Sequence, residues 1–190
     1  GIRYITLCHS SDNQICDSCA TKVKTWGGLT QFGREVVAEM NRLGMLVDVS
    51  HVSDETFYDV LKYSSRPVVA THSCCRALAD HPRNMTDDMI RALASAGGVI
   101  QINFYPVFLD SSFTYSEGMD MSVRPSYRSI ADHIDHVVSL VGTDHVGIGS
   151  DFDGIEVTPK GMEDISMMPV LFDELRKRGY SEADLEKIAS

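Results

Sequence analysis

Histidine and aspartate side chains stand at the ends of several strand-like segments of this sequence. His9, His51 and His72 each follow a short run rich in β-branched and apolar residues, and Asp151 follows another such run. Neutral imidazole nitrogens on separate rigid elements can hold zinc while leaving positions open for water, as in catalytic zinc sites. For any one of these histidines, the alternative is a hydrogen bond to the backbone at its strand end. Three histidines in equivalent positions favour a metal site.

Other polar residues fit the same region. Asn103 and Tyr105 stand at the end of a further strand-like run, and Arg83 lies in a proline-fixed turn after His72. A guanidinium can bind a carboxylate through two parallel hydrogen bonds, so Arg83 is a candidate for binding an acidic group of a substrate. A surface position for Arg83 is the alternative.

Two further groups of potential metal ligands are interpreted as structural. Residues 132–136, DHIDH, contain an H-x-D but lie within a helical pattern, and we predict that they form its solvated face. Cys16 and Cys19 form a C-x-x-C, which could be half of a zinc knuckle or a redox pair, yet no second such motif follows. The adjacent Cys74 and Cys75 are expected to pack as small apolar residues.

Composition limits the compartment and the partners. The odd number of cysteines, 5, excludes a complete internal disulfide framework and favours a reducing compartment, so we expect a cytoplasmic location. The formal net charge of −10 makes nucleic acids and anionic membranes poor partners. No apolar stretch approaches the ~20 residues that a membrane-spanning helix needs. The 190 residues, 43% of them hydrophobic, are expected to form a single domain, residues 1–190.

Short strand-like runs alternate with helical patterns, which predicts an α/β fold with a mainly parallel sheet. Strands are expected at residues 2–7, 45–50, 67–71, 99–104 and 145–149. Helices are expected at residues 30–43, from 53, at 87–96, 128–141 and 171–178, and from 181, several of them beginning at a Ser or Thr cap. Residues 105–127 lack periodicity and are expected to form a long loop, of the kind that is usually functional or mobile.

This order of elements brings the polar residues to one end of the sheet. In a barrel of alternating strands and helices, the carboxyl ends of the strands converge on one mouth. Residues that are far apart in the sequence, such as His9 and Asp151, would therefore meet in space, beneath the loop of residues 105–127. The pattern predicts an active site at this mouth.

Taken together, these segments resemble the membrane (renal) dipeptidase family of zinc-dependent dipeptidases. The matching residues run in family order through nearly the whole chain: 1–7 with His9, 41–48 with 51–53, 71–73, 83–84, 103–105, 132–136 and 151–154. The resemblance implies a (β/α)8 TIM barrel of the metallohydrolase type, of which this chain carries about five βα units. It also implies a hydrolase of dipeptides, in some members including dipeptides with D-amino acids, or β-lactams.

The resemblance also implies roles for four residues at the substrate. His9, Arg83, Tyr105 and Asp151 would contact the dipeptide. His9 would stabilise the developing oxyanion, and Arg83 would hold the carboxylate. Asp151 would hold the amino end and relay a proton to the leaving amine, so that His9 and Asp151 are the catalytic candidates.

For the metal, the resemblance implies two bridged zinc ions and a metal-activated hydroxide that attacks the peptide carbonyl. His51 and His72 match ligands of the second zinc. The family's other ligands, an H-x-D at the end of the first barrel strand and a bridging Glu, have no strand-end counterpart in this chain. We therefore expect half of the binuclear site here, and two protein ligands alone would hold zinc weakly.

Three functional hypotheses follow. The first is a zinc-dependent dipeptidase, and the second is a non-catalytic barrel remnant that acts through association. The third is another amidohydrolase-like metallohydrolase on the same scaffold. Because five βα units leave a barrel open along two edges, we expect either association through those edges, as in a homo-oligomer, or lost N-terminal residues.

Overall fold

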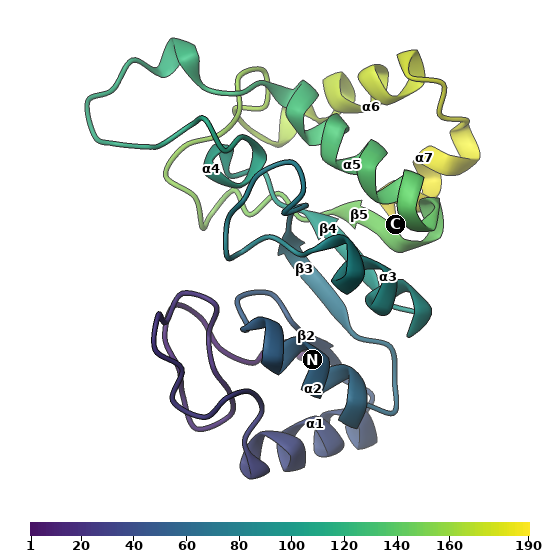
Figure 1. Ribbon diagram of the computed structural model, residues 1–190. Coiled ribbons are helices and arrows are strands. Elements are labelled where there is room, and N and C mark those ends of the chain that lie inside the picture. Colours follow the sequence, from purple (N-terminus) through teal and green to yellow (C-terminus); the bar gives the residue numbers. More distant parts are fainter.

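Five short parallel strands lie side by side, in chain order, in one sheet (Figure 1). The computed structural model describes residues 1–190, and its strands are β1 (Tyr4–Thr6), β2 (Leu46–Asp48), β3 (Val69–Ser73), β4 (Val99–Ile102) and β5 (Val146–Ile148). All five predicted strands are confirmed, although most are shorter than predicted. The third lies further along the chain than predicted, so His72 belongs to the strand itself rather than to the turn after it.

Helices connect the strands and follow the last one. They are α1 (Gln31–Leu43), α2 (Asp54–Tyr63), α3 (Asp87–Ser95), α5 (Tyr127–Val141), α6 (Met168–Lys177) and α7 (Glu182–Ala189), with short 3-10 turns at Met121–Val123, Thr143–His145 and Ile165–Met167. The caps predicted at Ser53 and Thr86 are confirmed, and Thr30 caps α1 in the same way: each hydroxyl accepts a hydrogen bond from a backbone N–H in the first turn. The capping box at Ser181 is confirmed as well. Local sequence therefore determines where most helices begin.

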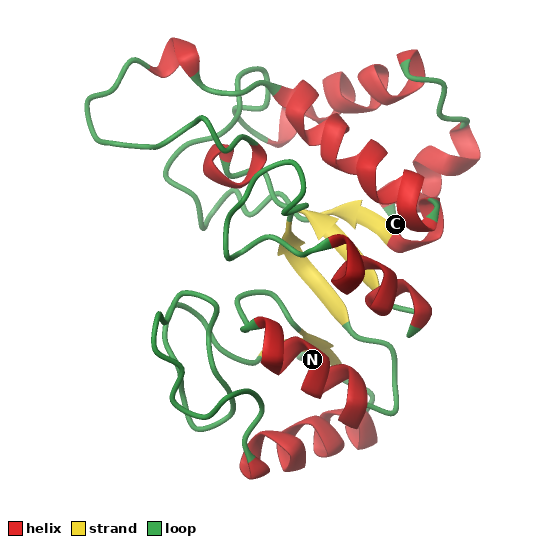
Figure 2. Ribbon diagram, in the orientation of Figure 1, coloured by secondary structure: helices red, strands yellow, loops and turns green.

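The helices cover one side of the sheet, and the long loops gather at the carboxyl ends of the strands (Figures 1 and 2). Each of the first three long helices contributes a fully buried side chain to a common core, namely Val37, Phe57 and Leu93. Burying a side chain of this size stabilises a fold by roughly 1.5–3 kcal/mol. None of the helices combines the length and hydropathy needed to span a lipid bilayer. The core fixes the strands, and the strands position the loops.

The segment of residues 105–127 contains more structure than the sequence predicts. It begins with a short helix, α4 (Pro106–Leu109), in which Phe108 and Leu109 are buried. Proline is well suited to the first position of a helix because its missing N–H would have no partner there. The prediction of a continuous loop is wrong for this part, because apolar side chains in tertiary contact stabilise a single helical turn without any periodic pattern.

The interpretation of residues 132–136 as a solvated face is wrong for one residue, His133. This imidazole is fully buried on α5, where Nδ1 accepts a hydrogen bond from the Cys75 N–H at 3.0 Å and Nε2 donates to the Leu109 carbonyl at 3.1 Å. Burial lowers the pKa of His133 to about 4. Asp132 and Asp135 do point outward and both bind Arg178, at 2.7 Å. Helix α5 thus uses His133 to hold the segment that follows β3 and the end of α4.

Replacing His133 with alanine should destabilise the fold by about 2–4 kcal/mol, since it creates a cavity and leaves two buried backbone groups without partners. The pKa of His133 lies below its ordinary value in the folded chain. Its stabilising effect is therefore complete above the ordinary histidine pKa of about 6.5 and is lost as pH falls towards 4. Urea unfolding followed by circular dichroism measures both effects. His136→Ala is the control, because His136 lies on the same helix but is partly exposed, and equal losses would contradict the role of His133.

Candidate functional site

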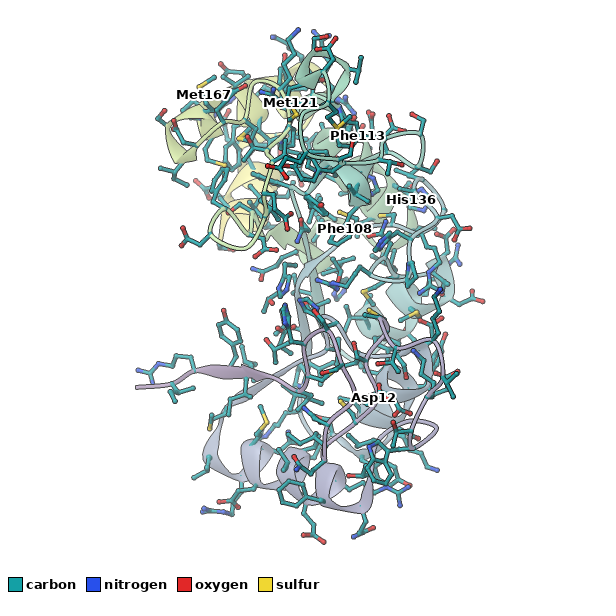
Figure 3. All side chains as sticks on the ribbon, turned by 90° about the vertical axis from the view of Figure 1, so that its left-hand side faces the viewer. Asp12, Phe108, Phe113, Met121, His136 and Met167 are labelled. Carbon is teal, nitrogen blue, oxygen red and sulfur yellow. The ribbon has the colours of Figure 1, made fainter.

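One pocket at the carboxyl ends of the strands is lined by all six residues predicted for the site: His9, His51, His72, Arg83, Tyr105 and Asp151. Its volume is about 600 Å³, within the ~300–1,000 Å³ of small-molecule sites. Its walls come from the N-terminal loop, including Asn13, and from α4 with Phe108. Figure 3 looks onto this side of the molecule, with Phe108 in the upper half and Asp12 of the N-terminal loop in the lower half.

Two imidazoles meet inside the pocket. The Nε2 atoms of His51, just after β2, and His72, on β3, are 2.8 Å apart. Burial, with the nearby Arg83 charge, lowers the pKa of His51 to about 3 and also lowers the pKa of His72. Both rings are therefore neutral near pH 7, which is the protonation state in which histidine binds metals.

His51 and Asp151 have an unusual backbone conformation. They are the only non-glycine residues with positive φ, at 71° and 60°. Such conformations cost about 1–3 kcal/mol each and persist where surrounding contacts enforce them, often at functional sites. The His51 carbonyl is held by the Cys19 N–H at 2.8 Å, and the Asp151 carbonyl by the Gly154 N–H at 2.9 Å. The strain occurs at two of the six predicted site residues.

The C-x-x-C segment has a structural role beside the pocket. All five cysteines are free thiols. The Ser18 hydroxyl, between the two cysteines, donates to the carbonyls of His9 at 2.6 Å and His51 at 3.2 Å. The neighbouring Asp17 is fully buried, and its carboxylate accepts from the backbone N–H groups of Thr25, Trp26 and Gly28. This segment therefore fixes the N-terminal loop against the backbone of His9 and His51.

Arg83 is buried, with 8% of its surface exposed, so the alternative of a surface position is wrong. Its guanidinium donates to the His72 carbonyl at 2.8 Å and lies 5.4 Å from the centre of the Phe108 ring. No carboxylate of the chain lies within ion-pair distance of it. A buried cation without a partner carboxylate, facing a pocket, is suited to binding an anionic group.

Asn103 connects two of the predicted residues. Its amide Nδ2 donates to Asp151 Oδ2 at 3.0 Å, and its Oδ1 accepts from the Tyr105 N–H at 2.6 Å. Burial, together with Glu156, raises the pKa of Tyr105 to about 12, so the phenol keeps its proton. The sequence places Asn103 at a strand end but does not indicate this bridging contact. The amide orients the Asp151 carboxylate toward the pocket.

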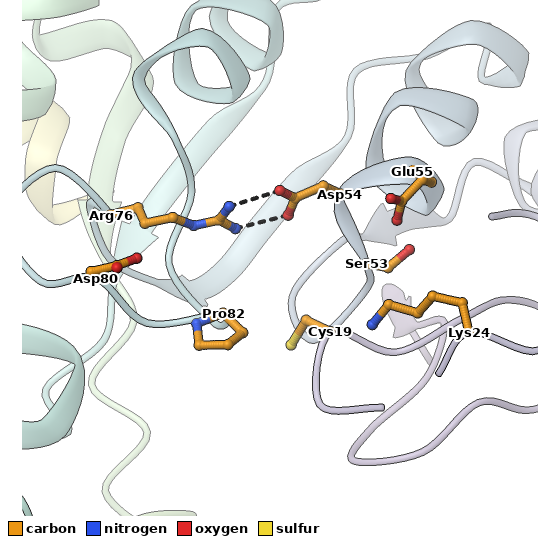
Figure 4. A pocket seen from close by; sticks show the side chains of 8 residues that line it. All are labelled: Cys19, Lys24, Ser53, Asp54, Glu55, Arg76, Asp80 and Pro82. Atoms are coloured by element: carbon orange, nitrogen blue, oxygen red, sulfur yellow. Dashed lines mark hydrogen bonds and ion pairs between the residues drawn. The ribbon is translucent and has the colours of Figure 1, made fainter. Parts of the chain in front are cut away.

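A second, smaller hollow of about 270 Å³ lies beside the site (Figure 4). Its main feature is the bidentate ion pair of Arg76 with Asp54, with N···O distances of 2.7 and 2.8 Å. Asp54 begins the helix that follows His51, and Arg76 follows His72 closely in the chain. Lys24 in the same hollow donates to two backbone carbonyls. Because Arg76 and Asp54 pair across it, we interpret this ion pair as a brace between the segments that carry the two imidazoles.

The residues present fit a metal as two of its ligands. Neutral Nε2 atoms of His51 and His72 converge in the pocket, and imidazole nitrogen is a preferred zinc ligand. No group of three or more His, Cys, Asp or Glu side chains is arranged to hold a metal ion anywhere in residues 1–190. Further ligands would therefore have to be water, substrate or groups outside these residues.

Comparisons with known proteins agree on one family. The model of the membrane dipeptidase family, peptidase family M19, matches residues 1–190. An uncharacterised dipeptidase of Schizosaccharomyces pombe is 40% identical over 190 residues, which is 100% of this chain and 44% of that protein. Dipeptidase verJ of Clonostachys rogersoniana is 42% identical over 188 residues, or 99% of this chain and 46% of that protein. The chain thus spans about half the length of these curated relatives.

Solved structures share the fold. A metallopeptidase from Rhodobacter sphaeroides, liganded with a phosphinate mimic of the dipeptide L-Ala-D-Ala, matches with a TM-score of 0.87 and 33% identity, over 100% of this chain and 53% of that one. The probable dipeptidase PvdM from Pseudomonas aeruginosa matches with a TM-score of 0.88 and 28% identity, over 99% of this chain and 60% of that one. The five βα units are part of the TIM-barrel arrangement of these enzymes, as the sequence predicts.

Proposed function

This chain belongs to the membrane dipeptidase family, peptidase family M19, and we propose that its pocket binds a dipeptide and takes part in zinc-dependent hydrolysis of the peptide bond. The observation that carries the proposal is the presence of two kinds of group in one pocket. The His51 and His72 imidazoles offer metal ligands, and the unpaired Arg83 guanidinium offers a site for a carboxylate. In a dipeptide the peptide carbonyl lies close to the terminal carboxylate, so one molecule could contact both kinds of group.

His51 and His72 would hold the zinc ion through their Nε2 atoms. When bound, zinc supplies Lewis acidity and an activated water for attack on the peptide carbonyl. The strained backbone of His51 and its contacts with Ser18 and Cys19 keep one of these nitrogens directed at the other. Rigid support of this kind favours metal binding because less ordering is needed when the metal arrives.

The other residues of the pocket would bind and orient the substrate. Arg83 would bind the terminal carboxylate through two N–H donors. Asp151, oriented by Asn103, would accept hydrogen bonds from the terminal ammonium group. It would also relay a proton to the leaving amine. His9 is exposed at the pocket mouth with its ring 4.5 Å from that of His51, and there it would donate to the peptide oxygen as negative charge develops.

The substrate class follows from size and charge. A pocket of about 600 Å³, lined by the Arg83 cation and by Asp151 and Glu156, suits a small zwitterion with a carboxylate at one end and an ammonium group at the other. The Rhodobacter sphaeroides structure carries a mimic of L-Ala-D-Ala, which supports small side chains on the substrate. Phe108 and Tyr105 supply an apolar wall for them.

The proposal is tested by assaying the purified chain against L-Ala-L-Ala and L-Ala-D-Ala, with added zinc and with a chelator. We expect hydrolysis that requires zinc and stops when the metal is removed, together with zinc in the metal analysis of the active protein. If neither zinc nor hydrolysis is found, the proposal is wrong for this chain and the non-catalytic alternative is favoured.

We also propose that a second copy of the chain covers the open edge of the sheet. β1 is one of the two edge strands, and near it the side chains of Ile2, Tyr4 and Ile5 are 70%, 50% and 38% exposed. Exposed apolar edge strands tend to associate. Sedimentation equilibrium should detect a dimer that Ile5→Lys weakens and that Val123→Lys, at an exposed apolar residue of a 3-10 turn, leaves intact. A monomer at all concentrations would contradict this.

A further inference from the structure

His72 is connected through its second ring nitrogen to a buried carboxylate. The Thr71 hydroxyl is 2.7 Å from His72 Nδ1 and 2.7 Å from Asp48 Oδ2. Asp48 ends β2, whereas Thr71 and His72 are neighbours on β3. A chain of two hydrogen bonds thus links two adjacent strands directly beneath the imidazole pair.

Asp48 is fully buried and receives four hydrogen bonds. The donors are the hydroxyls of Thr6 at 2.6 Å and Thr71 at 2.7 Å and the backbone N–H groups of Ser50 at 2.9 Å and Thr71 at 3.0 Å. Four donors directed at two oxygens match an ionised carboxylate, which only accepts hydrogen bonds. The Thr71 hydroxyl must therefore give its single proton to Asp48.

The direction of that bond determines the tautomer of His72. Because the Thr71 hydroxyl has used its proton, its oxygen can only accept from His72, and Nδ1 must carry the hydrogen. The other neighbour of this hydroxyl is Ser50 Oγ, at 3.4 Å. This contact is longer than the two of 2.7 Å to Asp48 and His72, so it does not change the assignment. Nε2 of His72 is then left with its lone pair, directed at His51 Nε2.

We propose that Thr71 and Asp48 are positioning residues that hold His72 in the Nδ1–H tautomer, so that Nε2 is ready to bind a metal. The inference rests on the proposed function for the role of His72, but the tautomer itself does not depend on it. It also makes the two imidazoles unequal. His51 Nε2 lies 2.8 Å from the unprotonated Nε2 of His72, so in the metal-free chain His51 Nε2 must carry the hydrogen that joins the two rings.

The direct test is the nitrogen-15 spectrum of the histidine rings in the metal-free chain, under mildly alkaline conditions where imidazoles are neutral. Long-range proton–nitrogen correlations distinguish the two tautomers. We expect the Nδ1–H pattern for His72 and the Nε2–H pattern for His51. An Nε2–H pattern for His72 in the unmodified chain would overturn the proposal without any variant being needed.

A pair of variants tests the cause. Thr71→Val keeps the shape and removes the hydroxyl, whereas Thr71→Ser keeps the hydroxyl. Thr71→Val should lose the Nδ1–H pattern and lower zinc affinity in calorimetry by about 10–100-fold, as loss of an outer-shell partner does, and Thr71→Ser should restore both. An unchanged tautomer in Thr71→Val would overturn the role of Thr71. An Nδ1–H pattern in a chain that binds no zinc would support the tautomer assignment and count against the proposed function alone.

Discussion

Replacing His72 with alanine is expected to lower the zinc affinity of the chain by more than about 100-fold, because loss of even an outer-shell partner costs about 10–100-fold and His72 is a proposed ligand. The chain offers two converging imidazoles and no larger cluster of metal-binding side chains. After the substitution only one of the two converging imidazoles remains, and one such nitrogen cannot hold zinc at a fixed position. Zinc-dependent hydrolysis should disappear together with the bound metal.

Isothermal titration calorimetry with zinc measures this effect, and His145→Ala is the matched control. His145 lies before β5, where Nδ1 contacts the Gly98 carbonyl at 2.9 Å, and it does not line the pocket. The control should bind zinc like the unmodified chain. Equal zinc affinity in His72→Ala and the unmodified chain would remove His72 from the metal site and with it the proposed mechanism.

Much of the site could be predicted because it depends on strand ends. Alternation of βα units is visible in the sequence, and parallel strands bring their carboxyl ends to one edge whatever the details of packing. His51, His72 and Asp151 follow from this rule alone, and the structure gathers them in one pocket. Ser and Thr caps predict helix starts for an equally local reason, because the capping hydrogen bond forms within four residues.

The parts that could not be predicted depend on contacts between distant residues. His133 has the sequence environment of a solvated helix face, yet it bridges residues 58 and 24 positions away, at Cys75 and Leu109. The bridge from Asn103 to Asp151 spans 48 positions. Positive φ at His51 likewise reflects tertiary contacts such as the bond from the Cys19 N–H, since the conformation is uncommon in non-glycine residues. A single sequence carries periodicity and caps but not the partners of a buried polar group.

The contacts around the pocket also explain why the strained backbone of His51 can persist. Arg76 and Asp54 join the segments behind the two imidazoles, and Ser18 ties His9 to His51. The His51 turn is therefore held both by the Ser18 hydroxyl and through α2, whose first residue, Asp54, is bound by Arg76. Side chains that are already ordered lose little freedom when a ligand binds. The contacts formed on folding offset the energy of the strained His51 backbone.

The second large effect is expected at Arg83. Arg83→Met should reduce kcat/KM for a dipeptide by about 100- to 10,000-fold, because hydrogen bonds to a charged group contribute about 1.5–3 kcal/mol each and a guanidinium makes two to a carboxylate. Most of the loss should appear in KM, since the carboxylate is bound in both the ground state and the transition state. Arg83→Lys keeps the charge but not the paired donors, so it should restore only part of the activity.

The substrate provides the decisive control. A dipeptide amide lacks the carboxylate, so the unmodified protein should hydrolyse it poorly, and Arg83→Met should hydrolyse it no worse than the unmodified protein does. Because Arg83 is a buried charge without a carboxylate partner, its replacement by an apolar side chain of similar length should not destabilise the fold strongly. A loss of activity that is equal for the dipeptide and its amide would mean that Arg83 acts on the pocket as a whole. Selective loss on the free acid would identify the guanidinium as the carboxylate site.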